Sequence, residues 1–150
     1  MGVPTTGEAT IEIDAPPEAI YDLVTDVTRM GEWSPECVKC EWQGAPGQVG
    51  STFKGHNKSG PARWKTVARV EVADRPSEFT FATLYKDGPS TRWSYRFEGT
   101  GPTKVTESFE AIKSPPLIAF AEKYFLRNRQ QQLEEGMQTT LARIKAAVES

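Results

Sequence analysis

The chain of 150 residues has few of the side chains that build metal centres and disulfide frameworks, since it contains two cysteines and one histidine. Two cysteines cannot staple a small scaffold, and a structural zinc site needs four ligands. Charge of one sign is not in excess either, because 18 basic and 20 acidic residues give a formal net charge of −2. A sequence-independent nucleic-acid binder needs a positive face, so we expect no nucleic-acid partner.

Long hydrophobic runs are also missing. A membrane helix needs about 20 apolar residues, and the best stretch here, 115–121, is much shorter. The first ten residues lack the basic start and apolar run of a secretory signal. We therefore expect a cytoplasmic protein without integral membrane association, folded as one domain over residues 1–150 with 1–8 as a loose tail. Monomer and homodimer both remain open.

Alternation of apolar and polar residues predicts strands separated by short turns. The predicted strands cover 9–14, 37–42, 51–57, 63–73, 78–85, 91–98 and 103–112. Between the first two, Pro16 and Pro17 open a helix whose apolar face is Ile20, Leu23 and Val24, and a second short helical segment covers 28–33. Short connections favour antiparallel pairing of neighbouring strands.

The segment 114–150 is predicted to be one long C-terminal helix. Its second half carries an apolar stripe that includes Leu133, Met137 and Leu141, whereas the apolar residues of its first half lie roughly on the opposite face. This conflict predicts a break or kink near 126–129, or a first half that packs differently.

The predicted strands are rich in aromatic residues on one face and charged on the other. The aromatic face must be covered from water, and the C-terminal helix is the only predicted element that is large enough to cover it. The predicted fold is α+β: a curved antiparallel sheet of about seven strands wrapped around a long C-terminal helix, with two short helices after the first strand. Because rigid rings line a space without collapsing into it, this arrangement favours a cavity for a small hydrophobic molecule.

Several motifs carry a resemblance that spans residues 9–149. They are Ile11-x-Ile13-x-Ala15-Pro16, Trp33-Ser34-Pro35, Gly50-Ser51-Thr52-Phe53-x-Gly55-x-Asn57, Trp64, Trp93-Ser94-Tyr95-Arg96-Phe97, Val105-Thr106-Glu107 and Gly136-Met137-x-Thr139-Thr140-Leu141. With them the chain resembles the START-like, helix-grip superfamily (SRPBCC), in its polyketide cyclase/dehydratase-like branch. The resemblance implies a deep pocket for lipids, polyketides or aromatic molecules, and only some members are enzymes. The fold alone does not name the reaction.

Glu107 is the candidate catalytic residue. It shares a predicted inward face with Val105 and Phe109, where loss of water would raise its pKa and suit it to general acid or base work. The alternative is that Glu107 pairs with a basic residue such as Arg96 at a rim.

Candidate ligand-binding residues are rings and polar tips on the predicted inward faces and on the helix. They are Phe53, Asn57, Trp64, Phe81, Tyr85, Trp93, Tyr95, Phe109, Phe120, Tyr124 and Arg129. Each has a plain structural alternative: the rings fill the core, Asn57 caps a turn, and Arg129 belongs to a solvated face instead of meeting an anionic group.

Cys37 and Cys40 have CxxC spacing but fall on a predicted strand, so their side chains should point to opposite faces. We therefore expect a structural role for them, no metal site and no cofactor. His56 is expected on the polar face with Lys54 and Lys58, away from any pocket.

Three functions remain open from the sequence. The first is binding of a small hydrophobic (aromatic, polyketide or lipid-like) ligand between sheet and helix. The second is a cofactor-independent cyclase/dehydratase that uses Glu107 as acid or base. The third is a non-catalytic protein-interaction module, in which the pocket would be collapsed.

Overall fold

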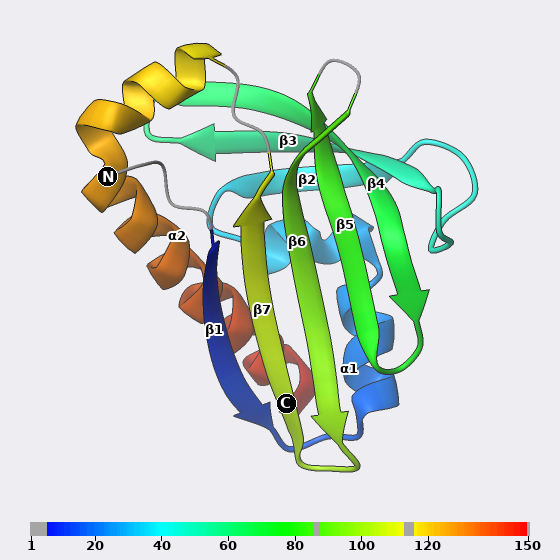
Figure 1. Cartoon of the computed structure of the whole chain (residues 1–150). Helices are drawn as coiled ribbons and strands as arrows, with labels where there is room; N and C mark the ends of the chain where they lie inside the picture. The colour runs from blue at the N-terminus through cyan, green and yellow to red at the C-terminus, as the bar shows by residue number, and fades with distance from the viewer. Residues whose placement is uncertain (1–5, 86–87, 113–115, 150) are drawn as a thin grey trace.

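The structure, a computed structural model, describes residues 6–85, 88–112 and 116–149, without the side chains of 116–130. Its elements, in chain order, are β1 (Thr6–Ile13), α1 (Pro17–Val24), the 3₁₀ helix η1 (Val27–Glu32), β2 (Cys37–Trp42), β3 (Thr52–Ser59), β4 (Ala62–Asp74), β5 (Glu78–Tyr85), β6 (Gly88–Gly99), β7 (Thr103–Ala111) and α2 (Pro116–Glu149). Figure 1 shows them as a curled sheet with the helices on one side.

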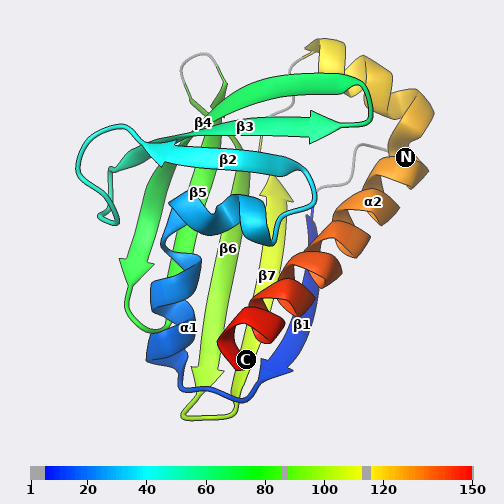
Figure 2. The same ribbon diagram turned by 180° about the vertical axis from the view of Figure 1, so that it is seen from behind.

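All seven strands form one antiparallel sheet in the order β1-β7-β6-β5-β4-β3-β2. From β2 to β7, strands that follow each other in the sequence pair with each other, as their short turns require. The exception is β1, which pairs with β7 at the other end of the sequence. The sheet curls strongly, so that β2 and β3 cross behind the upper parts of β5 and β6 in Figure 1 and in front of them in Figure 2. This confirms the predicted helix-grip architecture, and the curl creates the concave face on which the site lies.

The helices line that concave face (Figure 2). The second half of α2 lies along β1, and it buries Met137, Leu141 and Ile144 in the core. A break near 126–129, the first form of this prediction, is wrong, because α2 is uninterrupted from Pro116 to Glu149. Arg and Gln are good helix formers, so nothing in that stretch opposes helical backbone. The ribbon does bend between its yellow and orange parts, which agrees with the alternative of a kink in this helix (Figures 1 and 2). Among the described helices, none is long and apolar enough to cross a membrane.

The expected loose tail over 1–8 is also wrong where the structure describes it. β1 starts at Thr6, because β7 is long enough to pair Thr6, Gly7 and Glu8 with its own C-terminal residues. Gly7 lies so close to the Phe109 ring that an added Cβ would come within 2.6 Å of it. Residues 1–5 lie outside the described part of the chain.

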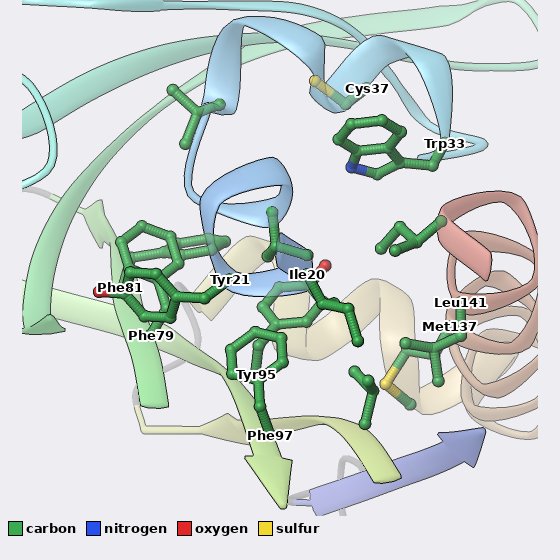
Figure 3. Close-up of a cluster of buried hydrophobic side chains, with 14 of the residues drawn as sticks. Ile20, Tyr21, Trp33, Cys37, Phe79, Phe81, Tyr95, Phe97, Met137 and Leu141 are labelled. Atoms are coloured by element: carbon green, nitrogen blue, oxygen red, sulfur yellow. The ribbon is translucent and has the colours of Figure 1, made fainter. Parts of the chain in front are cut away.

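The aromatic face of the sheet is packed solid at one end. Tyr21 of α1 meets Phe79 and Phe97 edge-on, with ring centroids 6.3 and 5.7 Å apart. Ile20, also from α1, is fully buried beside them (Figure 3). Since α1 fills this end, any remaining space under the sheet must lie toward β2, β3 and the middle of α2.

Candidate functional site

A cavity of about 620 Å³ occupies the other end of the concave face. Its walls come from β3 to β7, from the η1–β2 segment, and from α2 at Leu133, Gly136, Met137 and Thr140. Pro35, Trp64, Lys65 and Gln132 are the exposed members of the lining and mark its open side. A volume of this size is within the range of about 300–1,000 Å³ that small-molecule sites have.

Most of the residues expected at a ligand site line this cavity. They are Phe53, Asn57, Trp64, Phe81, Tyr85, Trp93, Tyr95, Glu107 and Phe109. Trp64 is 36% exposed, so it stands at the open side and not in the depth. The side chains of Phe120, Tyr124 and Arg129 lie outside the described residues, and their expected roles stay predictions.

Ring contacts make the cavity wall stiff. Phe53 and Phe81 meet edge-on with centroids 5.1 Å apart, and Trp42 packs against Phe53 from the strand next to it. On the opposite wall Trp93 and Phe109 lie 5.5 Å apart. Such pairs hold each other in place, so the walls stay apart without a packed centre.

Glu107 is 5% exposed and faces the cavity from β7, which excludes the alternative of a rim pair with Arg96. Arg96 instead reaches toward Glu78, with a 3.9 Å nitrogen–oxygen distance. The Tyr95 hydroxyl donates a hydrogen bond of 2.9 Å to Oε2 of Glu107. Oε1 is buried and has no hydrogen-bond partner among the described residues.

Burial raises the pKa of Glu107 to about 8, and the hydrogen bond from Tyr95 offsets part of this rise. The carboxyl group is therefore mostly protonated at neutral pH. Because Tyr95 donates to Oε2, the acid proton belongs on Oε1. The same burial raises the pKa of Tyr95 well above its ordinary value, so the phenol stays a donor. The pair presents a neutral acid to an apolar cavity.

The two other polar residues singled out by the sequence are placed differently. Asn57 lines the cavity, where its amide donates to the Thr66 hydroxyl at 3.2 Å. His56 points to the other face of β3, as expected, and lies 3.1 Å from the Glu41 carboxylate. His56 therefore takes no part in the cavity.

The expectation that Cys37 and Cys40 point to opposite faces is wrong. A β-bulge between Cys37 and Lys39 inserts an extra residue in β2, so both cysteines face inward. Their Sγ atoms are 3.2 Å apart, and both side chains line the cavity. A hydrogen bond from the Cys40 thiol lowers the pKa of Cys37, and the same contact together with burial raises the pKa of Cys40.

Sequence reasoning missed Met30 and Met137 as well as these cysteines. Met30 is in η1, which packs on β2, and its thioether lies 3.8 Å from Cys40 Sγ. The CxxC spacing could have indicated that the two cysteines lie together, but alternation along a regular strand placed them on opposite faces. No sequence signal marked Met30.

No group of three His, Cys, Asp or Glu side chains that could hold a metal ion occurs in the described part of the chain. The arrangement can enclose an apolar molecule and offer it one acid proton. The open cavity also argues against the reading as an interaction module, which required a collapsed pocket.

Comparisons with known proteins agree with this geometry. A family model described as "Polyketide cyclase / dehydrase and lipid transport" matches residues 4–149. The solution structure of the Polyketide_cyc-like protein Cgl2372 from Corynebacterium glutamicum is 32% identical, with a TM-score of 0.67, over 96% of this chain and 91% of that one. No curated protein matches the chain.

Two more distant structures share the fold. The Zhui aromatase/cyclase from Streptomyces sp. R1128 is 13% identical with a TM-score of 0.71, over 96% of this chain and 93% of that one. The di-domain aromatase/cyclase BexL of the BE-7585A biosynthetic pathway is 16% identical with a TM-score of 0.71, over 97% of this chain and 47% of that one. The match over 4–149 settles the family: the chain belongs to the polyketide cyclase / dehydrase and lipid transport family.

Proposed function

We propose that the protein binds a small, mostly apolar molecule that carries a carbonyl or hydroxyl group. The observation that carries this proposal is the cavity of about 620 Å³, which is walled by aromatic rings and contains one buried neutral acid. Rings such as Phe81 and Trp93 favour a flat, ring-containing ligand over a flexible chain, because they offer rigid faces for stacking.

Glu107 supplies the polar anchor. Its protonated Oε1 has hydrogen-bonding capacity left over, because only Oε2 is engaged by Tyr95. Oε1 is covered in this conformation, so a ligand would reach it only after a rotation about the soft terminal torsion of Glu107, which also moves Oε2 away from Tyr95. A carbonyl oxygen of the ligand would then accept the acid proton. The family description and the aromatase/cyclase relative support a ligand of this chemistry.

A matched ligand pair tests the proposal by calorimetry and native mass spectrometry. We expect one 2-acetylnaphthalene per chain, bound about five- to tenfold more tightly than naphthalene, as one hydrogen bond would give. Glu107→Leu should remove this preference and keep naphthalene binding. Glu110→Gln is the control, because Glu110 pairs with Arg92 on the outer face of the sheet. This variant should change neither the preference for 2-acetylnaphthalene nor the affinity for naphthalene.

A filled cavity completes the test. Gly136→Leu adds a side chain at a lining position of α2 and should weaken both ligands. If neither compound binds to the unaltered protein, or if Gly136→Leu leaves both affinities unchanged, the cavity is not the binding site. Equal affinity for the two compounds would remove Glu107 from the proposal.

A second candidate function is dehydration or cyclisation of a β-hydroxy ketone. The observation that favours it is the pKa of about 8 at Glu107, which lets one carboxyl group exist in both forms near neutral pH. Its ionised form can take the proton next to the ketone, and the acid so formed can protonate the leaving hydroxyl, which departs as water. A bicyclic β-hydroxy ketone would show this as enone absorbance. Glu107→Gln should bind the compound and leave it unchanged, and turnover by this variant at the original rate would reject the role.

A further inference from the structure

Three sulfur atoms meet in one corner of the cavity. Cys37 and Cys40 Sγ are 3.2 Å apart, and Met30 Sδ lies 3.8 Å from Cys40 Sγ. All three residues line the cavity. The bulge in β2 is what makes this cluster possible, because residues three apart on a regular strand would point to opposite faces.

The approach of η1 fixes the corner from the other side. An added Cβ at Gly31 would come within 2.1 Å of the carbonyl oxygen of Val38, the residue that follows Cys37 in the bulge. Only glycine permits this approach, which carries Met30 up to the two thiols. The cluster therefore depends on two local features, the bulge and the glycine, that have no evident purpose for an apolar ligand.

We propose that Met30, Cys37 and Cys40 form a binding site for a soft, thiophilic cation in the cavity wall. Thiolate and thioether ligands select soft ions over Mg²⁺ or Ca²⁺. Metal–sulfur bonds of about 2.3 Å, as in zinc thiolates, separate sulfurs in a trigonal site by about 4 Å. The Cys40–Met30 separation of 3.8 Å is near that value, whereas the Cys37–Cys40 separation of 3.2 Å is shorter, so binding requires the cysteine pair to open.

Charge and access decide which soft ions fit. Cys37 and Cys40 are 7% and 6% exposed, so an ion reaches them through the cavity. A divalent ion replaces two thiol protons and leaves a neutral centre, which suits apolar walls better than a net charge does. A site made of sulfur ligands alone serves a soft ion such as Cd²⁺ better than zinc, which is only borderline-soft.

Cadmium is the probe, added to the reduced protein without any organic ligand, so the result is independent of the proposed function. We expect one Cd²⁺ per chain, a thiolate-to-cadmium absorbance band, and protection of both thiols from a thiol reagent. Mg²⁺ should do none of these. Cys37→Ser should abolish the band.

Methionine variants test the Cd²⁺ site independently if a cysteine variant fails to fold. Met30→Leu should weaken the affinity for Cd²⁺ on the order of tenfold, because even residues that touch only the ligands of a metal change its affinity about 10- to 100-fold. Met137→Leu is the matched control, because Met137 lines the same cavity but lies apart from Cys37 among the buried hydrophobic side chains (Figure 3). Free thiols at equimolar Cd²⁺, or equal effects of the two methionine variants, would overturn the site.

Discussion

Tyr95 and Glu107 stand directly opposite each other on β6 and β7, and the phenol donates a 2.9 Å hydrogen bond to the carboxyl group. Both side chains are buried, and no basic side chain among the described residues contributes to the pKa of Glu107. The strand register therefore places a neutral acid beside the phenol, with Oε2 engaged and Oε1 without a partner among the described residues. This pair links the fold to the proposed chemistry.

Glu107 should make the protein less stable as the pH rises. The pKa of a free glutamate is 4.5 and that of Glu107 is about 8, so between these values the folded chain holds one more proton than the unfolded chain. This contribution to the free energy of unfolding is full below pH 4.5, falls by about 1.4 kcal/mol per pH unit, and levels off above pH 8. Glu107→Gln removes the titration.

Urea unfolding at several pH values measures the effect. The stability of the original protein relative to Glu107→Gln should fall by about 2–3 kcal/mol between pH 5 and pH 7. All other titrating groups are common to both chains and cancel in the difference. A difference that stays constant over this window would mean that Glu107 titrates normally and is not a buried neutral acid.

Tyr95→Phe should move the pKa of Glu107 above about 8. The hydrogen bond from Tyr95 is the contact that lowers this pKa, so its loss leaves burial unopposed. Oε2 would then lose the 2.9 Å hydrogen bond from the phenol, which should cost about 1–3 kcal/mol of stability. The side-chain carbonyl signal of Glu107, assigned by its absence in Glu107→Gln, reports the pKa by NMR. A pKa that moves down instead would show that the phenol does not stabilise the ionised form.

Much of this site could be predicted from alternation along the strands. Phe79 and Phe81 on β5, and Glu107 and Phe109 on β7, face inward as a regular two-residue period requires. The period also separated His56 from the cavity. These strands have no bulge in the stretches concerned, so local pattern and final geometry agree.

The period fails where a bulge adds a residue. One bulge turns Cys37 to the same face as Cys40, and another between Val70 and Val72 moves the inward face of β4 from Val72 to Ala73. A bulge arises from tertiary curvature of the sheet, and its position is not encoded in the apolar pattern of one strand. The sequence pattern also could not predict which end of the aromatic face is packed and which end is open, because this depends on where α1 ends.

Two glycine-to-alanine substitutions should have opposite effects on stability. Gly31→Ala places a Cβ within 2.1 Å of backbone at Val38, which cannot yield cheaply, so it should destabilise by about 1–3 kcal/mol. Gly136→Ala meets only Pro35 Cγ at 3.5 Å inside a helix, and should stabilise by about 0.5–1 kcal/mol. Thermal unfolding of both variants checks the signs. A stabilising Gly31→Ala would show that η1 does not pack on the bulge as described.

Phe79 and Phe81 offer the sharpest comparison between the solid and hollow ends, since they are two residues apart on the inward face of β5. Phe79 is 0% exposed among packed rings, whereas Phe81 has the cavity on one side. Phe79→Leu should therefore destabilise by about 1–2 kcal/mol through lost contacts, and Phe81→Leu by less. Phe81→Leu should in turn change the affinity for 2-acetylnaphthalene, which Phe79→Leu should leave intact. Equal stability losses with equal binding would mean that the ring at Phe81 has no open space beside it in solution.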